Sequence, residues 1–277
     1  MPRAVPAVLS IAGSDSGGGA GIQADLKAFA RAGVHGMTAI TALTAQNTVA
    51  VTGVHAVPGD FIVEQVRAVA RDIGVDAVKI GMLGTGEIVG AVAAALELLE
   101  PGTPVVIDPV MVAESGAVLL DDGARRALAE TLLPRATVIT PNLPEARMLA
   151  GAGAPDDLEE LARAVHALGP GVVVITGGHR EEATDVLFDG AEIHFIPGER
   201  HPDGAAHGSG CTHSSTLAAH LALGRTPLQA ARAARAIAAA AVRDGLRGLG
   251  AGPGPVDVLG LTRASAPGTH DAVVAGV

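Results

Sequence analysis

The sequence is poor in several residue types on which other proteins build structure or recognition. Its 277 residues include one cysteine, no tryptophan, no tyrosine and four phenylalanines. One cysteine cannot form an internal disulfide, and the first ten residues lack the long apolar segment of a signal peptide, so we expect the reducing cytoplasm. A net charge of −10 and the scarcity of aromatic rings argue against nucleic-acid binding, which uses a basic surface and stacking side chains.

Charged residues are also absent from the stretch 32–59, and the mean hydropathy of the chain is +0.39, so a membrane span has to be considered. The stretch contains Gln46, Asn47, Pro58 and several threonines, which would place many polar groups in lipid. We therefore expect buried strands joined by a loop, and neither a membrane nor nucleic acid as a partner.

Short β-branched segments alternate with alanine-rich helical patterns along most of the chain. This alternation predicts an α/β protein with three layers, in which helices cover both faces of a mostly parallel central sheet. The segments with the composition of buried strands are 4–12, 36–45, 76–80, 104–108, 136–140 and 171–176.

The remaining segments complete this expected fold. We predict an edge strand at 51–57, a hairpin that turns at Asp189 and Gly190, and final helices that begin at Cys211 and extend from Pro227 to Leu246. No change of composition marks a linker, so residues 1–262 are predicted to form one domain and residues 263–277 a frayed tail.

The stretch "GSDSGGGAG", residues 13–21, follows the first predicted strand and has five glycines in nine residues. A phosphate loop of the Walker type needs Lys and then Ser or Thr after its last glycine, and Gly18 is followed here by Gly19 and Ala20. Dinucleotide binding needs an acidic residue about 20 positions further on, where the uncharged stretch lies. The glycines therefore indicate backbone that lies close to another kind of ligand.

Two further loops follow predicted strands at the same edge of the sheet, where ligands bind in open α/β sheets. In "TPNLPEA", Asn142 and Glu145 are three positions apart at the start of a helix, a spacing that a helix cap alone would explain. Asp108 ends a strand before a proline and has an equally ordinary interpretation as a turn residue. Taken alone, these residues favour the structural interpretations.

The stretch "AHGSGCTHSS", residues 206–215, contains the only cysteine, between a glycine turn and an expected helix. The first amides of such a helix, expected from Cys211 to His213, can bind the phosphoryl group during its transfer. A thiol at a helix N-terminus has a lowered pKa, so Cys211 is a candidate base or nucleophile rather than a small buried side chain. A cysteine hydrolase with a Cys211–His213 pair is disfavoured, because residues two apart on a helix point to different faces.

Taken in order, the motifs "IAGSDSGGGAGIQADLKAF", "ITALTAQNT", "KIGML", "IDPVM", "LLPRATVITPNLPEA", "GGH" and "HGSGCT" resemble the ribokinase-like superfamily. Within it they are most similar to the hydroxymethylpyrimidine/phosphomethylpyrimidine kinases of thiamin biosynthesis. The resemblance covers nearly the whole chain. It implies a ribokinase-like fold, ATP and Mg²⁺ as cofactors, and a homodimer that phosphorylates hydroxymethylpyrimidine and then its monophosphate.

The resemblance also implies a role for each matching residue. Cys211 would take the proton from the hydroxymethyl group of the substrate, and Asp25 would lie near the reacting centre. The other implied contacts are Gln46, Gly13, Met82 and Val110 with the pyrimidine, Gly208 and Gly210 with the transferring phosphoryl group, Asn142, Thr176, Gly178 and Thr212 with the nucleotide, and Asp108 and Glu145 with Mg²⁺.

One position departs from the family pattern. The family often has Lys immediately before Gly-Gly-His, where this sequence has Thr176, and the only lysines are Lys27 in an expected helix and Lys79 at the end of an expected strand. We therefore expect phosphate charge to be met by Mg²⁺, the loop amides and the helix at Cys211, with a strong dependence on metal and a modest turnover.

Two alternative functions stay open at this point. A pyridoxine or pyridoxal kinase is one, because a branch of the same superfamily with a thiol at this position acts on that pyridine alcohol. Gln46 favours the aminopyrimidine over it. A catalytically silent pyrimidine-binding protein is the other, because Thr176 replaces the family's Lys, although the retention of Cys211, Asp108 and Glu145 argues against it.

Overall fold

The computed structural model describes residues 4–112, 119–177, 183–202 and 204–264. The strands within these residues are β1 (Ala7–Asp15), β2 (His35–Gln46), β3 (Val51–Ala56), β4 (Ala77–Ile80), β5 (Val105–Ile107), β6 (Val138–Ile139), β7 (Val172–Ile175), β8 (Asp185–Phe188) and β9 (Ile193–Ile196). Together they form one nine-stranded sheet in the order β3-β2-β1-β4-β5-β6-β7-β8-β9. Neighbours from β2 to β7 are parallel, and the pairs β2–β3, β7–β8 and β8–β9 are antiparallel.

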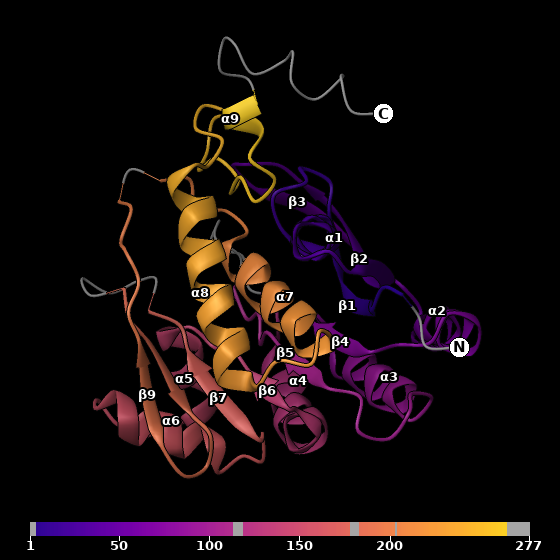
Figure 1. The fold of residues 1–277 in the computed structure, drawn as a ribbon. Coiled ribbons are helices and arrows are strands. Elements are labelled where there is room, and N and C mark those ends of the chain that lie inside the picture. Colours follow the sequence, from indigo (N-terminus) through magenta and orange to yellow (C-terminus); the bar gives the residue numbers. More distant parts are fainter. Residues whose placement is uncertain (1–3, 113–118, 178–182, 203, 265–277) are drawn as a thin grey trace.

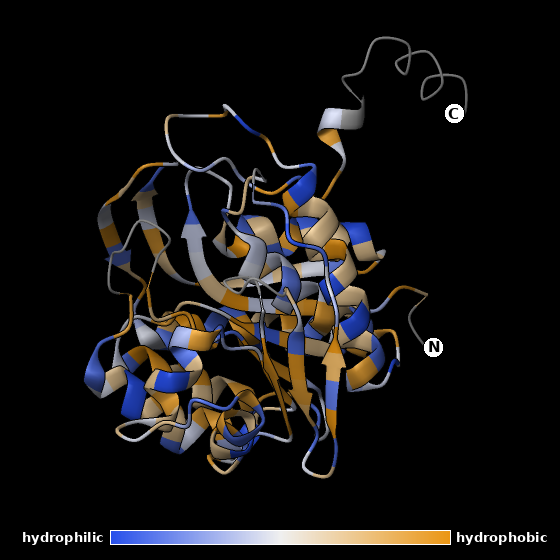
Figure 2. Cartoon of the chain, turned by 90° about the vertical axis from the view of Figure 1, so that its left-hand side faces the viewer, coloured by the Kyte–Doolittle hydropathy of each residue, from blue (hydrophilic) through white to orange (hydrophobic). Residues whose placement is uncertain are grey.

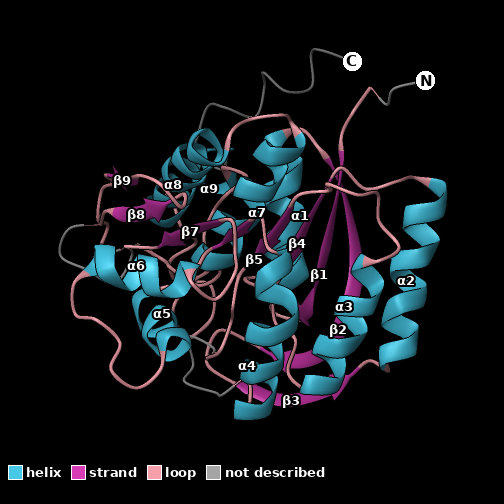
Figure 3. Ribbon diagram, turned by 90° about the horizontal axis from the view of Figure 1, so that it is seen from below, coloured by secondary structure: helices cyan, strands magenta, loops and turns pink. Residues whose placement is uncertain are grey.

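Helices cover both faces of this sheet, which gives the three layers seen in Figures 1 and 3. The helices are α1 (Gly21–Ala32), α2 (Gly59–Asp72), α3 (Gly86–Leu96), α4 (Asp122–Ala127), α5 (Leu143–Ala150), α6 (Leu158–His166), α7 (Ser209–Ala222), α8 (Pro227–Arg243) and the short α9 (Leu261–Ala264). Side chains of helices α2 to α6 pack against the strands in the core on one face. The core on the other face is filled from α1, α7 and α8. The three-layer, mostly parallel α/β architecture predicted from the sequence is thus confirmed.

The burial of each strand follows from its place in the sheet. β1 lies between two parallel neighbours, and its apolar residues from Ala7 to Ala12 are almost completely buried because helices cover both of its faces. β3 lies at the edge, and most of its residues are exposed, as the sequence predicted for this strand. Figure 2 shows the hydrophobic residues concentrated on the central strands. No helix in the described part of the chain is long and apolar enough to span a bilayer.

Several boundaries differ from the predicted ones. The strand expected at 136–140 is reduced to Val138–Ile139, because the chain enters the turn that precedes α5. α8 ends at Arg243 rather than at Leu246, since Gly245 packs so closely on Ala205 that a Cβ there would lie 2.6 Å from the Ala205 Cβ. Residues 263 and 264, predicted to begin a frayed tail, belong to α9, and the tail from residue 265 lies outside the described residues.

The start of α7 is packed against the loop that follows β1. Gly208, the N-cap residue of α7, has a φ of 82°, in the left-handed region that favours glycine. A Cβ at this position would lie 1.7 Å from the carbonyl oxygen of Gly19. Only glycine therefore allows the two loops to approach this closely.

Replacing Gly208 by alanine tests this contact. Gly224 is the matched control, because its φ is 79° and no atom lies within 4 Å of a Cβ added to it. We expect Gly224→Ala to lower the free energy of unfolding by about 1 kcal/mol, from the left-handed backbone alone. Gly208→Ala should cost roughly 2 kcal/mol more because of the overlap with Gly19. Equal losses in urea unfolding would show that the loops separate easily.

Candidate active site

The carboxyl ends of the parallel strands bring together the loops that the sequence analysis selected. β2 ends at Gln46, β4 is followed by Met82, β5 by Asp108 and β6 by Asn142. The amino end of α7 faces this edge, because a Cβ added to Gly210 would lie 4.0 Å from Asp108 Oδ2. Predicted site residues that are far apart in sequence are thus neighbours at one edge of the sheet.

The glycine-rich loop after β1 is organised by Asp15, a residue that the sequence analysis did not select. Its Oδ1 accepts a hydrogen bond from the Gly17 amide at 2.8 Å, and its Oδ2 accepts from the amides of Gly19 and Ala20 at 3.1 and 2.9 Å. His207 Nε2 lies 3.0 Å from the same Oδ2. Burial alone would raise the pKa of Asp15, but the bonds from His207 and the amides hold it below its ordinary value. Asp15 therefore joins the glycine loop to the loop before α7.

The first turn of α7 carries Gly210 and Cys211. The amide of Thr212 donates to the Gly208 carbonyl at 2.9 Å, so it belongs to the hydrogen-bond ladder of the helix. The helix begins two residues earlier than expected, and the amides available to an anion are those of Gly210 and Cys211 rather than those that follow. The Thr212 hydroxyl is buried and has no hydrogen-bond partner among the described residues.

Asp108 and Glu145 are both buried carboxyl groups at this edge. Asp108 Oδ2 accepts a hydrogen bond from Ser214 Oγ at 3.0 Å, and the Lys79 ammonium lies 4.0 Å from it. Glu145 Oε1 lies 3.5 Å from the Met111 amide. Burial, followed by repulsion from Asp108, raises the pKa of Glu145 to about 8, and burial also raises the pKa of Asp108. The two groups are close enough to disfavour each other's ionised form.

Asn142 and Glu145 also form the helix cap that their spacing predicted. The Asn142 side chain accepts from the Glu145 amide, and the Glu145 side chain accepts from the Asn142 amide, both at 2.9 Å. Thr176, which follows β7, forms a bridge with Asn142 and donates its amide to the Pro141 carbonyl at 2.9 Å. Asn142 and Thr176, both predicted to contact the nucleotide, are thus adjacent. Gly178 lies outside the described residues.

A charged cluster lies beneath this surface. Asp25 on α1 is fully buried, and its carboxylate accepts hydrogen bonds from Ser10 at 2.6 Å, Ser215 at 2.7 Å and Lys79 at 3.0 and 3.2 Å. Burial alone would lower the pKa of Lys79, but Asp25, Cys211 and Asp108 raise it above its ordinary value. The family resemblance implies a place for Asp25 near the reacting centre, whereas Lys79 has no role in it. The signal was available, since a lysine in the apolar strand "DAVKI" can be buried only against a partner.

The residues predicted to hold the pyrimidine come from neighbouring loops. Gly13 packs directly on Met82, since a Cβ at Gly13 would lie 2.5 Å from Met82 Cε. The Gln46 backbone exchanges hydrogen bonds of 2.8 and 2.7 Å with Ser16 Oγ, so the end of β2 is attached to the glycine loop. Val110 is half-buried beside Asp108, to whose carbonyl its amide donates at 2.8 Å.

Comparison with known proteins supports one family. Residues 15–257 match the sequence profile of the phosphomethylpyrimidine kinase family. The chain belongs to this family. A hydroxymethylpyrimidine/phosphomethylpyrimidine kinase of Streptomyces coelicolor is 47% identical over 92% of this chain and 95% of its own length. A bifunctional thiamine biosynthesis protein of Geobacter sulfurreducens is also 47% identical over 90% of this chain, which spans about half, 51%, of that protein.

The solved structures agree on the fold. Pyridoxal kinase from Staphylococcus aureus, in complex with ADP, has a TM-score of 0.84 and 35% sequence identity, over 94% of this chain and 96% of that chain. This likeness confirms the ribokinase-like architecture implied by the sequence motifs. As a member of the phosphomethylpyrimidine kinase family, the protein is a phosphotransferase.

The Cys211 thiol of this family member does not have the lowered pKa that its position at a helix end predicted. Burial, with the carboxylates of Asp25 and Asp108, raises the pKa of Cys211 to about 12, although Lys79 and the Gly21 amide act in the opposite direction. A helix end favours a thiolate by a modest amount, and desolvation beside two acidic groups outweighs it. In the unliganded protein Cys211 is therefore a neutral thiol.

His213 is not a partner of the thiol. Its Nε2 lies 3.1 Å from Asp185 Oδ2, and Asp185 Oδ1 accepts the Gly177 amide at 2.8 Å. Arg235 lies 3.7 Å from the same carboxylate. The argument from helix geometry against a Cys211–His213 pair is confirmed, and the histidine instead supports the loop that follows β7.

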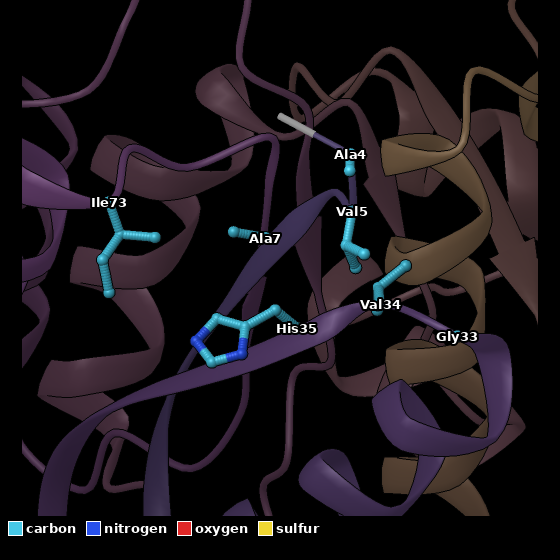
Figure 4. A pocket seen from close by; sticks show the side chains of 7 residues that line it. All are labelled: Ala4, Val5, Ala7, Gly33, Val34, His35 and Ile73. Atoms are coloured by element: carbon cyan, nitrogen blue, oxygen red, sulfur yellow. The ribbon is translucent and has the colours of Figure 1, made fainter. Parts of the chain in front are cut away.

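The hollow in Figure 4 lies away from the candidate active site. It has a volume of 490 Å³ and is lined by Ala4, Val5, Ala7, Gly33, Val34, His35 and Ile73. Ala7 and His35 are the first residues of β1 and β2, so the hollow is at the amino ends of the strands. A smaller hollow of 250 Å³, lined by Gly198 and Arg235 among others, lies beside Asp185.

The raised pKa of Cys211 can be tested by alkylation, because the chain has no other thiol. At pH 8 we expect iodoacetamide to react at least about a hundredfold more slowly with the folded, unliganded protein than with the same chain in guanidinium. Between pH 8 and pH 10 the rate should rise about tenfold per pH unit, followed by mass spectrometry. A rate that levels off below pH 9 would mean that the helix end, not burial, controls the thiol.

Proposed function

We propose that the protein is an ATP-dependent kinase that phosphorylates 4-amino-5-hydroxymethyl-2-methylpyrimidine and then its monophosphate, in thiamin biosynthesis. The observation that carries this proposal is the position of Cys211 and Gly210, which begin a helix opposite Asp108 at the edge of the sheet where Gln46 also lies. The names of relatives that are 47% identical over about nine tenths of the chain support the same substrate.

The amino end of α7 has the features that phosphoryl transfer requires of a protein, which are mainly position and charge neutralisation. The amides of Gly210 and Cys211 would bind the transferring phosphoryl group, and Gly208 would let their turn approach the glycine loop. As a thiolate, Cys211 would accept the proton of the substrate hydroxyl, which is not ionised at neutral pH, and the neutral thiol would first release its own proton to solvent. The nucleotide would lie over Asn142, Thr176, Gly178 and Thr212.

Mg²⁺ fits the two buried carboxyl groups of Asp108 and Glu145. Carboxylate oxygens suit this ion, which is commonly held by one or two of them together with substrate phosphates. The described residues include no cluster of three or more His, Cys, Asp or Glu side chains able to hold a metal, so the phosphates would complete the shell. Bound there, Mg²⁺ would neutralise phosphate and carboxylate charge, which would remove one cause of the raised pKa of Cys211.

The pyrimidine would rest on Gly13, Met82 and Val110, since the chain contains no tryptophan or tyrosine. The amide of Gln46 can donate and accept, which suits a ring nitrogen beside an exocyclic amine. Pyridoxal or pyridoxine is the second candidate substrate. It is favoured by the neighbour of TM-score 0.84, which is named a pyridoxal kinase.

We also propose that the enzyme acts in the cytoplasm as a homodimer. Val54 on β3 exposes 57% of its surface at one edge of the sheet, where a second copy could cover it. Light scattering of the purified protein measures the mass directly, and a monomer at micromolar concentration would refute this assembly.

The function is tested with purified protein, ATP, Mg²⁺ and either the hydroxymethylpyrimidine or pyridoxine, with mono- and diphosphate products separated by chromatography. We expect both phosphates from the pyrimidine. Product from pyridoxine alone would assign the second candidate, and no product from either would indicate a silent binder.

Cys211→Ala should lower kcat at least about tenfold with little change in KM, because it removes the base but not the binding surface. Unchanged kcat would leave the thiol a packing role.

Thr176→Lys tests the departure from the family pattern. Thr176 lies beside Asn142, so a lysine there would be able to reach the nucleotide phosphates. We expect the KM for ATP to fall about three- to tenfold, with a weaker dependence on Mg²⁺, because the added charge replaces part of the metal's role. Thr176→Met is the control for side-chain length. If both variants match the wild type, the missing lysine does not limit this enzyme.

A further inference from the structure

The Lys79 ammonium is fully buried at the point where β1, β4, α1 and α7 meet. It lies 3.0 Å from Asp25 Oδ1 and 4.0 Å from Asp108 Oδ2, and thus between the two carboxylates. The neighbouring Gly81 makes room for it, because a Cβ at Gly81 would lie 2.8 Å from Lys79 Nζ and 3.0 Å from Ala12 Cβ. The position of the ammonium is therefore fixed by its surroundings on more than one side.

Each of these carboxylates is bound by a serine from α7. Ser215 Oγ donates to Asp25 at 2.7 Å, and Ser214 Oγ lies 3.0 Å from Asp108 Oδ2. Ser214 Oγ is also 3.0 Å from the carbonyl oxygen of Gly210 and 3.2 Å from that of Cys211. The two serines are adjacent, and they follow the turn that carries the anion-binding amides and the thiol.

We infer that Lys79 is a positioning residue for phosphoryl transfer, which holds Asp25 and Asp108 in place and, through Ser215 and Ser214, fixes the first turn of α7. This inference rests on the proposed function. Because Lys79 is fully buried, it would touch neither substrate nor nucleotide. It acts by setting where Gly210 and Cys211 lie relative to Asp108.

A purely stabilising role explains the cluster less well. A buried ion pair seldom contributes more stability than apolar side chains of the same size, because both charges lose their hydration. Ala77, which lies on the same face of β4 as Lys79, packs in the apolar core formed with α1, α7 and α8, so this face of the strand accommodates apolar side chains. What apolar residues cannot provide is a fixed hydrogen-bonded connection from the sheet to the two serines of α7.

The two serines that donate to Asp25 provide a matched pair of variants. Ser10 and Ser215 are both fully buried and bind the same carboxylate, at 2.6 and 2.7 Å, but Ser10 belongs to β1 and only Ser215 belongs to α7. Ser215→Ala should lower kcat about tenfold while KM for both substrates stays within about threefold. Ser10→Ala should lower kcat less than about threefold, although it also removes one buried hydrogen bond.

A double variant separates position from stability. Lys79→Met together with Asp25→Asn removes both charges of the closer pair, and Asp108, which loses the cation at 4.0 Å, keeps the hydrogen bond from Ser214. We expect its unfolding midpoint to lie close to that of the wild type and its kcat to fall at least about tenfold. Lys79→Met alone should be less stable than the double variant, since it leaves the two carboxylates facing each other.

A second measurement does not depend on the substrate. Alkylation of Cys211 at pH 9 should be at least about threefold faster in Ser215→Ala than in the wild type or Ser10→Ala, because a loosened turn exposes the thiol. If the wild type phosphorylates neither alcohol, the proposed function fails and this comparison still tests the positioning. Equal alkylation and equal kcat in the two serine variants, or wild-type kcat in the double variant, would overturn the inference.

Discussion

A lysine ammonium between two carboxylates makes the candidate site possible. Asp25 and Asp108 are both buried, and Lys79 lies 3.0 and 4.0 Å from them, where its charge offsets their mutual repulsion. Burying these two carboxylates without a cation would be very unfavourable, since an isolated charge in a medium of low polarity shifts its pKa or unfolds the site. With Lys79 present, α7 can begin directly above the end of β5, and its first amides remain available to a ligand.

The glycine loop depends on a different interaction. Asp15 accepts three backbone amides of its own loop and pairs with His207, which comes 192 residues later and immediately precedes the N-cap of α7. This pairing keeps Gly208 against the Gly19 carbonyl, a distance that no side chain would permit. The loop after β1 and the turn before α7 thus behave as one unit, so a ligand that contacts one of them also meets the other.

The sequence was sufficient for the architecture, which depends on local pattern, and the ends of the strands bring most candidate site residues to one edge of the sheet. The buried strands, the edge strand β3 and the cap formed by Asn142 and Glu145 follow from periodicity and spacing. The pKa of Cys211 could not be predicted in this way. Its position at a helix end is visible in the sequence, whereas its pKa is raised by burial in the folded chain and then by two carboxylates, which come from α1 and from the end of β5.

Lys79 and Asp15 were missed for a related reason. Each looks ordinary among its neighbours in sequence and becomes important only through a partner that the fold brings close. The partner of Lys79, Asp25, is 54 positions away in sequence, and the partner of Asp15, His207, is 192 positions away. A lysine among the three apolar residues of β4 is a usable signal, since such a side chain needs a buried partner. The sequence does not identify that partner, which is Asp25 on α1.

The arrangement also separates two properties of the site. In the proposed function the first turn of α7, with Lys79 and the carboxylates around it, acts on the transferring group, whereas Gly13 near the end of β1, Gln46 at the end of β2 and Met82 after β4 contact the alcohol. A protein named for another substrate, the pyridoxal kinase, shares this fold with a TM-score of 0.84 and 35% sequence identity to this chain. Loops at strand ends can change without moving the sheet or α7, so the choice of alcohol can differ between relatives while the groups around the phosphate stay in place.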